Sequence, residues 1–209
     1  MKHLPNLLTG ARLVLSLFVF FALATAGGAV GLSRPAETIR SALVLSAFVA
    51  FVVAAVTDFF DGWLARRYGV VSVAGAILDP IADKVLICAA ILGLMALGSS
   101  PAIAVPGALI LFREFAVSAL REVTAGRGVK LPVTLLAKWK TTFQLVALGA
   151  EMIVAGWPAF GLPDDAALRG HAALGAHALL WLACIVTLVT GAQYGAQAWR
   201  ALSAGDGAR

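Results

Sequence analysis

Six long apolar runs constrain this chain more than any other feature of its sequence. A helix needs roughly 20 mostly apolar residues to cross a hydrocarbon core about 30 Å thick, and each run is about that long. Strands of transmembrane barrels instead alternate polar and apolar residues over short segments, so the runs predict an all-α membrane protein. We expect one domain over residues 1–209, with six transmembrane helices at about 7–27, 39–60, 75–97, 102–121, 137–157 and 172–199.

Composition excludes several other classes of protein. The chain is 61% hydrophobic and 13% charged, whereas soluble domains are about half apolar and a quarter charged. A disordered regulator is excluded because Leu, Val, Ile and Phe are abundant. The two cysteines, Cys88 and Cys184, lie inside apolar runs and have no spacing typical of a disulfide scaffold or a metal site.

Basic residues are distributed unevenly between the two ends of the predicted helices. Six crossings put both termini on one side, with 13 of the 16 Lys and Arg residues, and leave Arg34, Arg40 and Arg169 on the other. By the positive-inside rule we expect both termini in the cytoplasm, on a face that also attracts anionic membrane lipids. No nucleic acid is expected as a partner, because the basic residues alternate with membrane helices and no nucleic-acid-binding motif accompanies them.

Four aspartates between the second and third runs are the main candidates for a functional site. Asp58 and Asp61 are three residues apart, and Asp79 and Asp83 are four apart, so each pair would lie on one face of a helix. Carboxylates at membrane depth are costly and are usually functional. Two divalent cations would relieve the repulsion among four of them, and a site made of oxygen ligands alone favours Mg²⁺ or Mn²⁺.

The residues around these aspartates fit a phosphate ligand. Gly62 and Gly75 would let a ligand approach the helices closely, and the guanidinium group of Arg66 suits phosphate oxygens. The structural alternative is that the acids merely pair with Arg66, Arg67 and Lys84 at helix ends. That alternative leaves the two glycines and the regular spacing of the acids without an explanation.

The spacing Asp-x2-Asp-Gly-x2-Ala-Arg-x8-Gly-x3-Asp-x3-Asp resembles the signature of the CDP-alcohol phosphotransferases. The resemblance implies a homodimeric membrane enzyme of six helices, in which an alcohol hydroxyl displaces CMP from a CDP-linked lipid. It also implies that Asp58, Asp61 and Asp79 bind the metal ions. Asp83 would be the catalytic base and a further metal contact. The residues that would border the CDP-lipid are Asn6, Thr9, Gly62, Ala65, Arg66 and Gly75.

The acceptor alcohol is predicted from residues outside that motif. Four basic residues at the cytoplasmic ends of the fourth and fifth runs could bind a phosphorylated acceptor: Arg113, Arg121, Lys138 and Lys140. The alternative is that they reflect topology alone, with Arg113 paired to Glu114 or Glu122. The runs Arg-Glu-x6-Arg-Glu and Lys-x-Lys-Thr-Thr-x-Gln resemble the phosphatidylglycerophosphate synthases of that family. This implies CDP-diacylglycerol as donor, sn-glycerol 3-phosphate as acceptor, and a bacterial inner-membrane location.

Other functions remain open on the sequence alone. The same family also uses inositol phosphate or phosphatidylglycerol as acceptors. A small cation transporter would show matching acids in both halves, but the second half has only Glu151 in its runs. A scaffold with close-packed Gly- and Ala-rich helices would leave the four aspartates unexplained. Glu151 itself could reach the interface, hydrogen-bond across helices or lie at a subunit contact.

Overall fold

The computed structural model describes residues 4–30, 34–68, 73–98, 100–128 and 135–206. Within these ranges the side chains of residues 4–6, 59–68, 73–80, 83, 135–138 and 204–206 are not described. The elements are α1 (Leu4–Gly27), α2 (Glu37–Tyr68), α3 (Val73–Ala96), α4 (Pro101–Gly126), α5 (Leu135–Ala155), a 3₁₀ turn η1 (Trp157–Phe160) and α6 (Ala166–Asp206). All regular structure in these ranges is helical, which confirms the predicted class.

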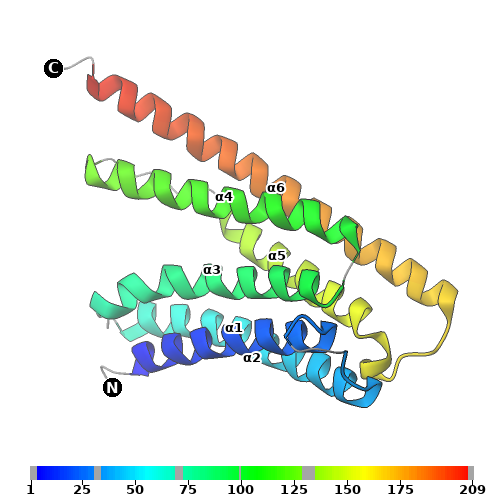
Figure 1. Ribbon diagram of the computed structural model, residues 1–209. Helices are drawn as coiled ribbons and strands as arrows, with labels where there is room; N and C mark the ends of the chain where they lie inside the picture. Colours follow the sequence, from blue (N-terminus) through cyan, green and yellow to red (C-terminus); the bar gives the residue numbers. More distant parts are fainter. Residues whose placement is uncertain (1–3, 31–33, 69–72, 99, 129–134, 207–209) are drawn as a thin grey trace.

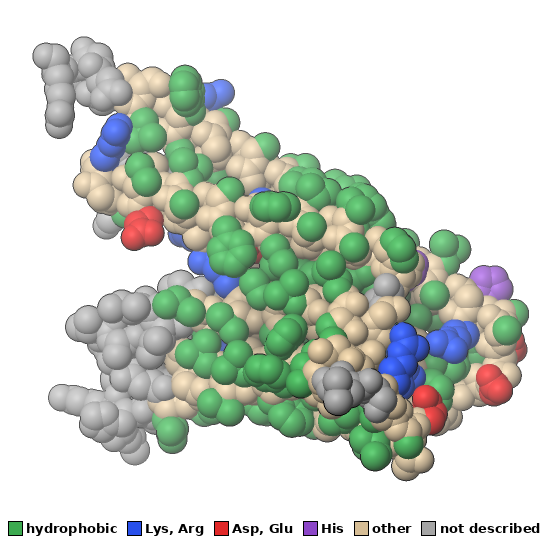
Figure 2. Space-filling view, viewed as in Figure 1, with side chains coloured by type: hydrophobic (Ala, Val, Ile, Leu, Met, Phe, Trp, Pro, Cys, Tyr) green, Lys and Arg blue, Asp and Glu red, His purple; other side chains and the backbone are tan. Residues whose placement is uncertain are grey.

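Four helices are long and apolar enough to cross a membrane, counting only the described residues: Leu7–Gly27, Glu37–Asp58, Pro101–Gly126 and Ala166–Ser203. A shorter apolar helix spans Lys84–Ala96. Large apolar side chains such as Phe112, Leu174 and Trp199 stand exposed on the outer faces, and apolar side chains cover much of the surface in Figure 2. Such surfaces are expected where lipid replaces water as the solvent.

Several helices extend beyond their predicted ends. α2 continues to Tyr68 rather than residue 60, so Asp58 and Asp61 lie inside the helix and not at its end. α4 continues to Gly126 rather than residue 121, and α6 runs from 166 to 206 rather than from 172 to 199. Hydropathy marks only the part of a helix that suits lipid, and the polar turns beyond it remain helical. Conversely, α5 ends at Ala155, and Trp157 belongs to η1, where Pro158 has no backbone N–H to continue a helix.

The helices pack as two groups that follow each other along the chain (Figure 1). α1 packs along both α2 and α3, and α6 packs along both α4 and α5, with sparser contacts between the groups. Small residues permit the close approaches. A Cβ at Gly27 would clash with the carbonyl oxygen of Ala96, and a Cβ at Gly107 would lie 2.7 Å from Cγ2 of Ile91. Close packing at small residues is typical of helices in membranes.

Successive long helices alternate in direction, which fixes what lies at each end of the molecule. The start of α1 and the end of α6 lie at the same end in Figure 1, together with the last turns of α2 and α4 and the first turns of α3 and α5. The other end holds the opposite ends of these helices. The two ends of the helical bundle thus agree with the expectation that both termini lie on one side. The two groups also separate toward the end that holds the termini, and Figure 2 shows Lys and Arg side chains where they part.

Candidate active site

The aspartate motif lies on two consecutive antiparallel helices, near the end of the first and the start of the second. α2 carries Asp58, Asp61, Gly62, Ala65 and Arg66, and α3 carries Gly75, Asp79 and Asp83. Both acid pairs therefore have the helical spacing that places their members on one face. Of the four acids only Asp58 has a described side chain. The contacts of the other seven motif residues lie outside the described part of the structure, as do those of Asn6.

α1 contributes a polar face that includes Thr9, which the sequence analysis assigns to the site, and Arg12 and Ser16, which it does not. Thr9, Arg12 and Ser16 are all buried and are spaced so that they lie on one side of the helix. The Arg12 guanidinium forms an ion pair with Asp58, with Nη1 2.5 Å from Oδ1. Ser16 donates a hydrogen bond to the Arg12 carbonyl oxygen at 2.8 Å. Because the Arg12 side chain is only 1% exposed, its positive charge needs a negatively charged partner. The ion pair therefore links Asp58 of the motif in α2 to a third helix, α1.

The chemistry of the motif fits divalent cations. Its four acids offer carboxylate oxygens without nitrogen or sulfur ligands, which is the donor set that Mg²⁺ and Mn²⁺ prefer. The one carboxylate described, that of Asp58, is 38% exposed and therefore open to a ligand while it contacts Arg12. Asp61, Asp79 and Asp83 stay predictions as metal ligands.

A second polar cluster lies between α4, α5 and α6, centred on the buried side chain of Glu114. Its Oε1 accepts hydrogen bonds from Lys140 Nζ at 2.5 Å, Arg113 Nη1 at 3.3 Å and Gln144 Nε2 at 3.3 Å. Gln144 also donates to Thr187 Oγ1 at 2.8 Å. We call these five residues the Glu114 network. The single Glu114 carboxylate thus contacts two buried cations, Arg113 of α4 and Lys140 of α5. The three side chains together carry a net positive charge.

α6 fixes the arginines at the edge of this network. Arg113 donates from Nη2 to Thr190 Oγ1 at 2.9 Å. The Tyr194 ring lies under two guanidinium groups, with its centroid 5.9 Å from Cζ of Arg113 and 5.7 Å from Cζ of Arg121. Cation–π contacts of this kind favour a cation over an aromatic face. The structure therefore brings Arg121, which is exposed, next to the buried Arg113.

Three of the four predicted acceptor residues are thus in one region, namely Arg113, Arg121 and Lys140. The side chain of Lys138 is outside those described. The predicted alternative partner of Arg113 is also present, because Arg113 pairs with Glu114. The cluster lies beside a motif-bearing helix, because α4 and α5, which carry Glu114 and Lys140, both contact α3, which carries Asp79 and Asp83.

Comparisons with known proteins identify the family of the chain. Residues 2–191 match the family model described as CDP-alcohol phosphatidyltransferase. The chain belongs to the CDP-alcohol phosphatidyltransferase family. The match covers most of the chain, including α1 and the Glu114 network as well as the aspartate motif.

Curated relatives in this family match the chain over nearly its whole length. A protein of Rickettsia bellii named CDP-diacylglycerol–glycerol-3-phosphate 3-phosphatidyltransferase is 36% identical over 196 residues, covering 92% of this chain and 93% of the relative. A Bacillus subtilis protein of the same name is 34% identical over 202 residues, covering 97% and 98%. A probable phosphatidylglycerophosphate synthase of Mycobacterium tuberculosis H37Rv is 38% identical over 198 residues, covering 95% and 82%.

The sequence analysis of this CDP-alcohol phosphatidyltransferase did not identify several polar residues that lie in the candidate site. Thr187, Thr190 and Tyr194 recur at three- and four-residue intervals in an otherwise apolar helix, and this spacing was a usable signal. Arg12 follows Thr9 by three residues, which was a similar signal on α1. Glu114 had been considered only as a partner of Arg113, and its contact with Lys140 could not be read from spacing.

Proposed function

We propose that this CDP-alcohol phosphatidyltransferase transfers the phosphatidyl group of CDP-diacylglycerol to sn-glycerol 3-phosphate and releases CMP. The observation that carries the proposal is the Glu114 network, which gathers Arg113 and Lys140 in the helix group that packs beside α3. Such cations suit the phosphate of a phosphorylated acceptor. The names and the near full-length match of the relatives support the same donor and acceptor.

In the proposed reaction, the acceptor hydroxyl oxygen bonds to the phosphorus of the phosphatidyl group, and the bond from that phosphorus to the CMP oxygen breaks. Asp83 takes the hydroxyl proton as general base. Asp58, Asp61 and Asp79, with Asp83, would hold two Mg²⁺ or Mn²⁺ ions, which when bound would offset the negative charge of the pyrophosphate and of the departing CMP. Arg12 keeps the Asp58 carboxylate oriented. This assignment is supported by the motif spacing and by the donor chemistry of the four acids.

The donor is proposed to lie along α1, α2 and α3. Its CDP group would border Asn6, Thr9, Gly62, Ala65, Arg66 and Gly75. Thr9 is buried one helical turn from Arg12, on the face of α1 that meets Asp58. The small side chains at 62, 65 and 75 leave room for a nucleotide close to the backbone. A basic side chain at 66 would bind pyrophosphate oxygens.

We further propose six membrane crossings in a bacterial inner membrane, with both termini and the site on the cytoplasmic side. Four apolar helices, the alternating helix directions and the excess of basic residues at the end that holds the termini support this topology. A homodimer, implied by the resemblance, would use part of the exposed apolar surface. Membrane lipids would cover the rest.

CMP release by the purified protein tests the proposed function directly. With CDP-diacylglycerol and Mg²⁺, we expect release with glycerol 3-phosphate and only slow release with glycerol, which lacks the phosphate that the basic cluster would bind. Inositol phosphate and phosphatidylglycerol complete the panel of acceptors. Equal rates with glycerol and glycerol 3-phosphate would contradict the acceptor site. Rapid release with inositol phosphate alone would assign the protein a different acceptor.

Replacing Arg113 with glutamine should raise the apparent KM for glycerol 3-phosphate about tenfold or more. A hydrogen bond to a charged group contributes about 1.5–3 kcal/mol, and about 1.4 kcal/mol corresponds to a factor of ten. The KM for CDP-diacylglycerol should change little, because the donor is proposed to bind on the other helix group. Arg200→Gln, at an exposed position of α6, is the matched control. An unchanged acceptor KM in a variant with the parent Tm would remove Arg113 from the site.

Gly191 offers a second test of the same site, because it lies against Arg113. A Cβ at position 191 would lie 2.8 Å from Cγ and 3.1 Å from Nε of Arg113, so Gly191→Ala should displace the guanidinium from Thr190. We expect a several-fold higher KM for glycerol 3-phosphate. The Tm should fall slightly or stay unchanged, because the helix propensity gained from alanine, about 1 kcal/mol, is offset by the loss of the buried Arg113–Thr190 hydrogen bond.

Gly195→Ala, one turn later in α6, is the matched control for this substitution. No atom lies within 4 Å of a Cβ placed at position 195. The Gly195→Ala variant therefore gains the same helix propensity without displacing Arg113. Kinetics and thermal melting of the two variants side by side make the comparison. Equal acceptor KM values for both variants would contradict the role given to the Arg113 position.

A further inference from the structure

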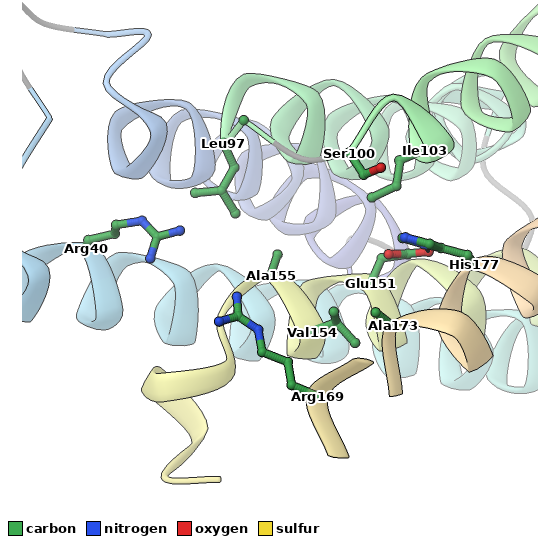
Figure 3. A pocket seen from close by; sticks show the side chains of 11 residues that line it. Arg40, Leu97, Ser100, Ile103, Glu151, Val154, Ala155, Arg169, Ala173 and His177 are labelled. Carbon is green, nitrogen blue, oxygen red and sulfur yellow. Dashed lines mark hydrogen bonds and ion pairs between the residues drawn. The ribbon is translucent and has the colours of Figure 1, made fainter. Parts of the chain in front are cut away.

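A cavity of about 300 Å³ lies at the end of the bundle opposite the aspartate motif (Figure 3). It is enclosed by the first turns of α2, α4 and α6 and the last turns of α3 and α5. Its apolar wall includes Leu97, Ile103 and Val154, and its polar side is formed by Arg40, Arg169, Glu151 and His177. Nothing in the proposed transfer reaction uses these residues.

The arginines at this end gather around the cavity. Arg40 and Arg169 line it, and Figure 3 shows their guanidinium groups reaching toward the same part of it. A Cβ on Gly98, which also lines the cavity, would lie 3.7 Å from Nη2 of Arg34. These three are all the Lys and Arg residues that the predicted topology puts on this side. The positive-inside rule disfavours basic residues here, so two arginines that line one cavity, with Arg34 close to a third lining residue, point to an anionic ligand.

The acidic groups at the cavity do not neutralise these arginines. The Glu151 carboxylate is 1% exposed and hydrogen-bonds to His177, with Oε1 2.7 Å from Nδ1. This pair lies apart from the two guanidinium groups in Figure 3. Of the roles considered for Glu151, the structure shows a hydrogen bond from one helix to another. Arg40 also contacts Glu37 at 3.2 Å, but that carboxylate is 65% exposed. An exposed ion pair of this kind stabilises little, so Arg40 can turn to a ligand at low cost.

We propose that this cavity binds the phosphate of an anionic phospholipid headgroup in the leaflet opposite the active site. Two guanidinium groups can bind phosphate oxygens through several parallel N–H bonds. The apolar wall beside them would contact the glycerol backbone and first acyl carbons of a lipid, which a free phosphate ion lacks. The cavity also lies where the helices end, at headgroup depth if the six helices span the bilayer. Its volume suits a headgroup and not a whole lipid.

Native mass spectrometry of the full-length protein, in detergent with added lipid, tests this site. Phosphatidylglycerol serves as the anionic probe and phosphatidylcholine as the zwitterionic one. We expect the double variant Arg40→Gln/Arg169→Gln to bind phosphatidylglycerol at least tenfold more weakly than the parent. Arg200→Gln, an exposed arginine at the other end, should bind it as the parent does. CMP release should be unchanged in all three proteins, which separates this site from the proposed active site.

A single variant and two competing ligands provide further tests of the proposed lipid site. Arg169→Gln alone changes an exposed residue, so it should fold even if the double variant does not, and it should also weaken phosphatidylglycerol binding. Unchanged phosphatidylglycerol binding in this variant would overturn the proposal. Equal binding of the two lipids by the parent would overturn the preference for an anionic headgroup. Inorganic phosphate that displaces phosphatidylglycerol at equal concentration would assign the cavity to a free anion instead.

Discussion

Asp79→Asn is expected to abolish CMP release while the helical content and the Tm stay close to those of the parent. A neutral amide binds a hard cation more weakly than a carboxylate does, and the three remaining acids would balance less of the metal charge. The measurement is the rate of CMP release over a range of Mg²⁺ concentrations, with circular dichroism on the same preparation. Asp61→Asn should behave in the same way. Asp58→Asn should also abolish CMP release, but with a lower Tm, because it removes the carboxylate that pairs with the buried Arg12 guanidinium.

Asp164→Asn is the matched control for these variants, because Asp164 is an exposed acid before α6 at the far end of the bundle. It should keep the parent rate at every Mg²⁺ concentration. A folded Asp79→Asn protein with near-parent turnover would remove Asp79 from the proposed metal ligands. Partial recovery of its rate at high Mg²⁺ would support the assignment, since it would show weakened metal binding.

Asp83→Asn is expected to lower turnover by roughly 10² to 10⁴, which is the usual contribution of general acid–base catalysis. Binding of CDP-diacylglycerol should weaken far less, because Asp83 is proposed to act on the acceptor hydroxyl. Separate values of kcat and of the KM for CDP-diacylglycerol make this distinction. Loss of donor affinity with parent-like turnover at saturation would instead make Asp83 a ligand of the donor site.

The positions of the helices could be predicted from this sequence, because a helix that crosses a bilayer needs an apolar run of about the same length each time. α1 was placed almost as it is observed, at 7–27 against Leu4–Gly27. The end of α2 was wrong because the turns from residue 61 to Tyr68 carry charges, which lower the hydropathy without breaking the helix. Trp157 was assigned to the fifth helix because its apolar character outweighed the proline that follows it.

Sequence spacing could suggest candidate site residues only where those residues are close in sequence. Regular spacing within α2 and α3 pointed to the four aspartates. The contacts of Glu114 could not be inferred, because Lys140 and Gln144 belong to another helix and no periodicity shows which helix faces meet. The pairing of Arg12 with Asp58 was missed for the same reason, since it depends on α1 packing along α2.

The division of the bundle into two groups has a consequence for synthesis of the protein. α1, α2 and α3 pack mainly with one another, and the segment that holds them ends at Ala96. Domains and compact units generally assemble from the N-terminus while the rest of the chain is still being translated, and contacts close in sequence form fastest. The three helices that carry Arg12 and the aspartate motif can therefore assemble while the later helices are still inside the ribosome or being made. The later half, with the Glu114 network, then docks onto a nascent half that is already built.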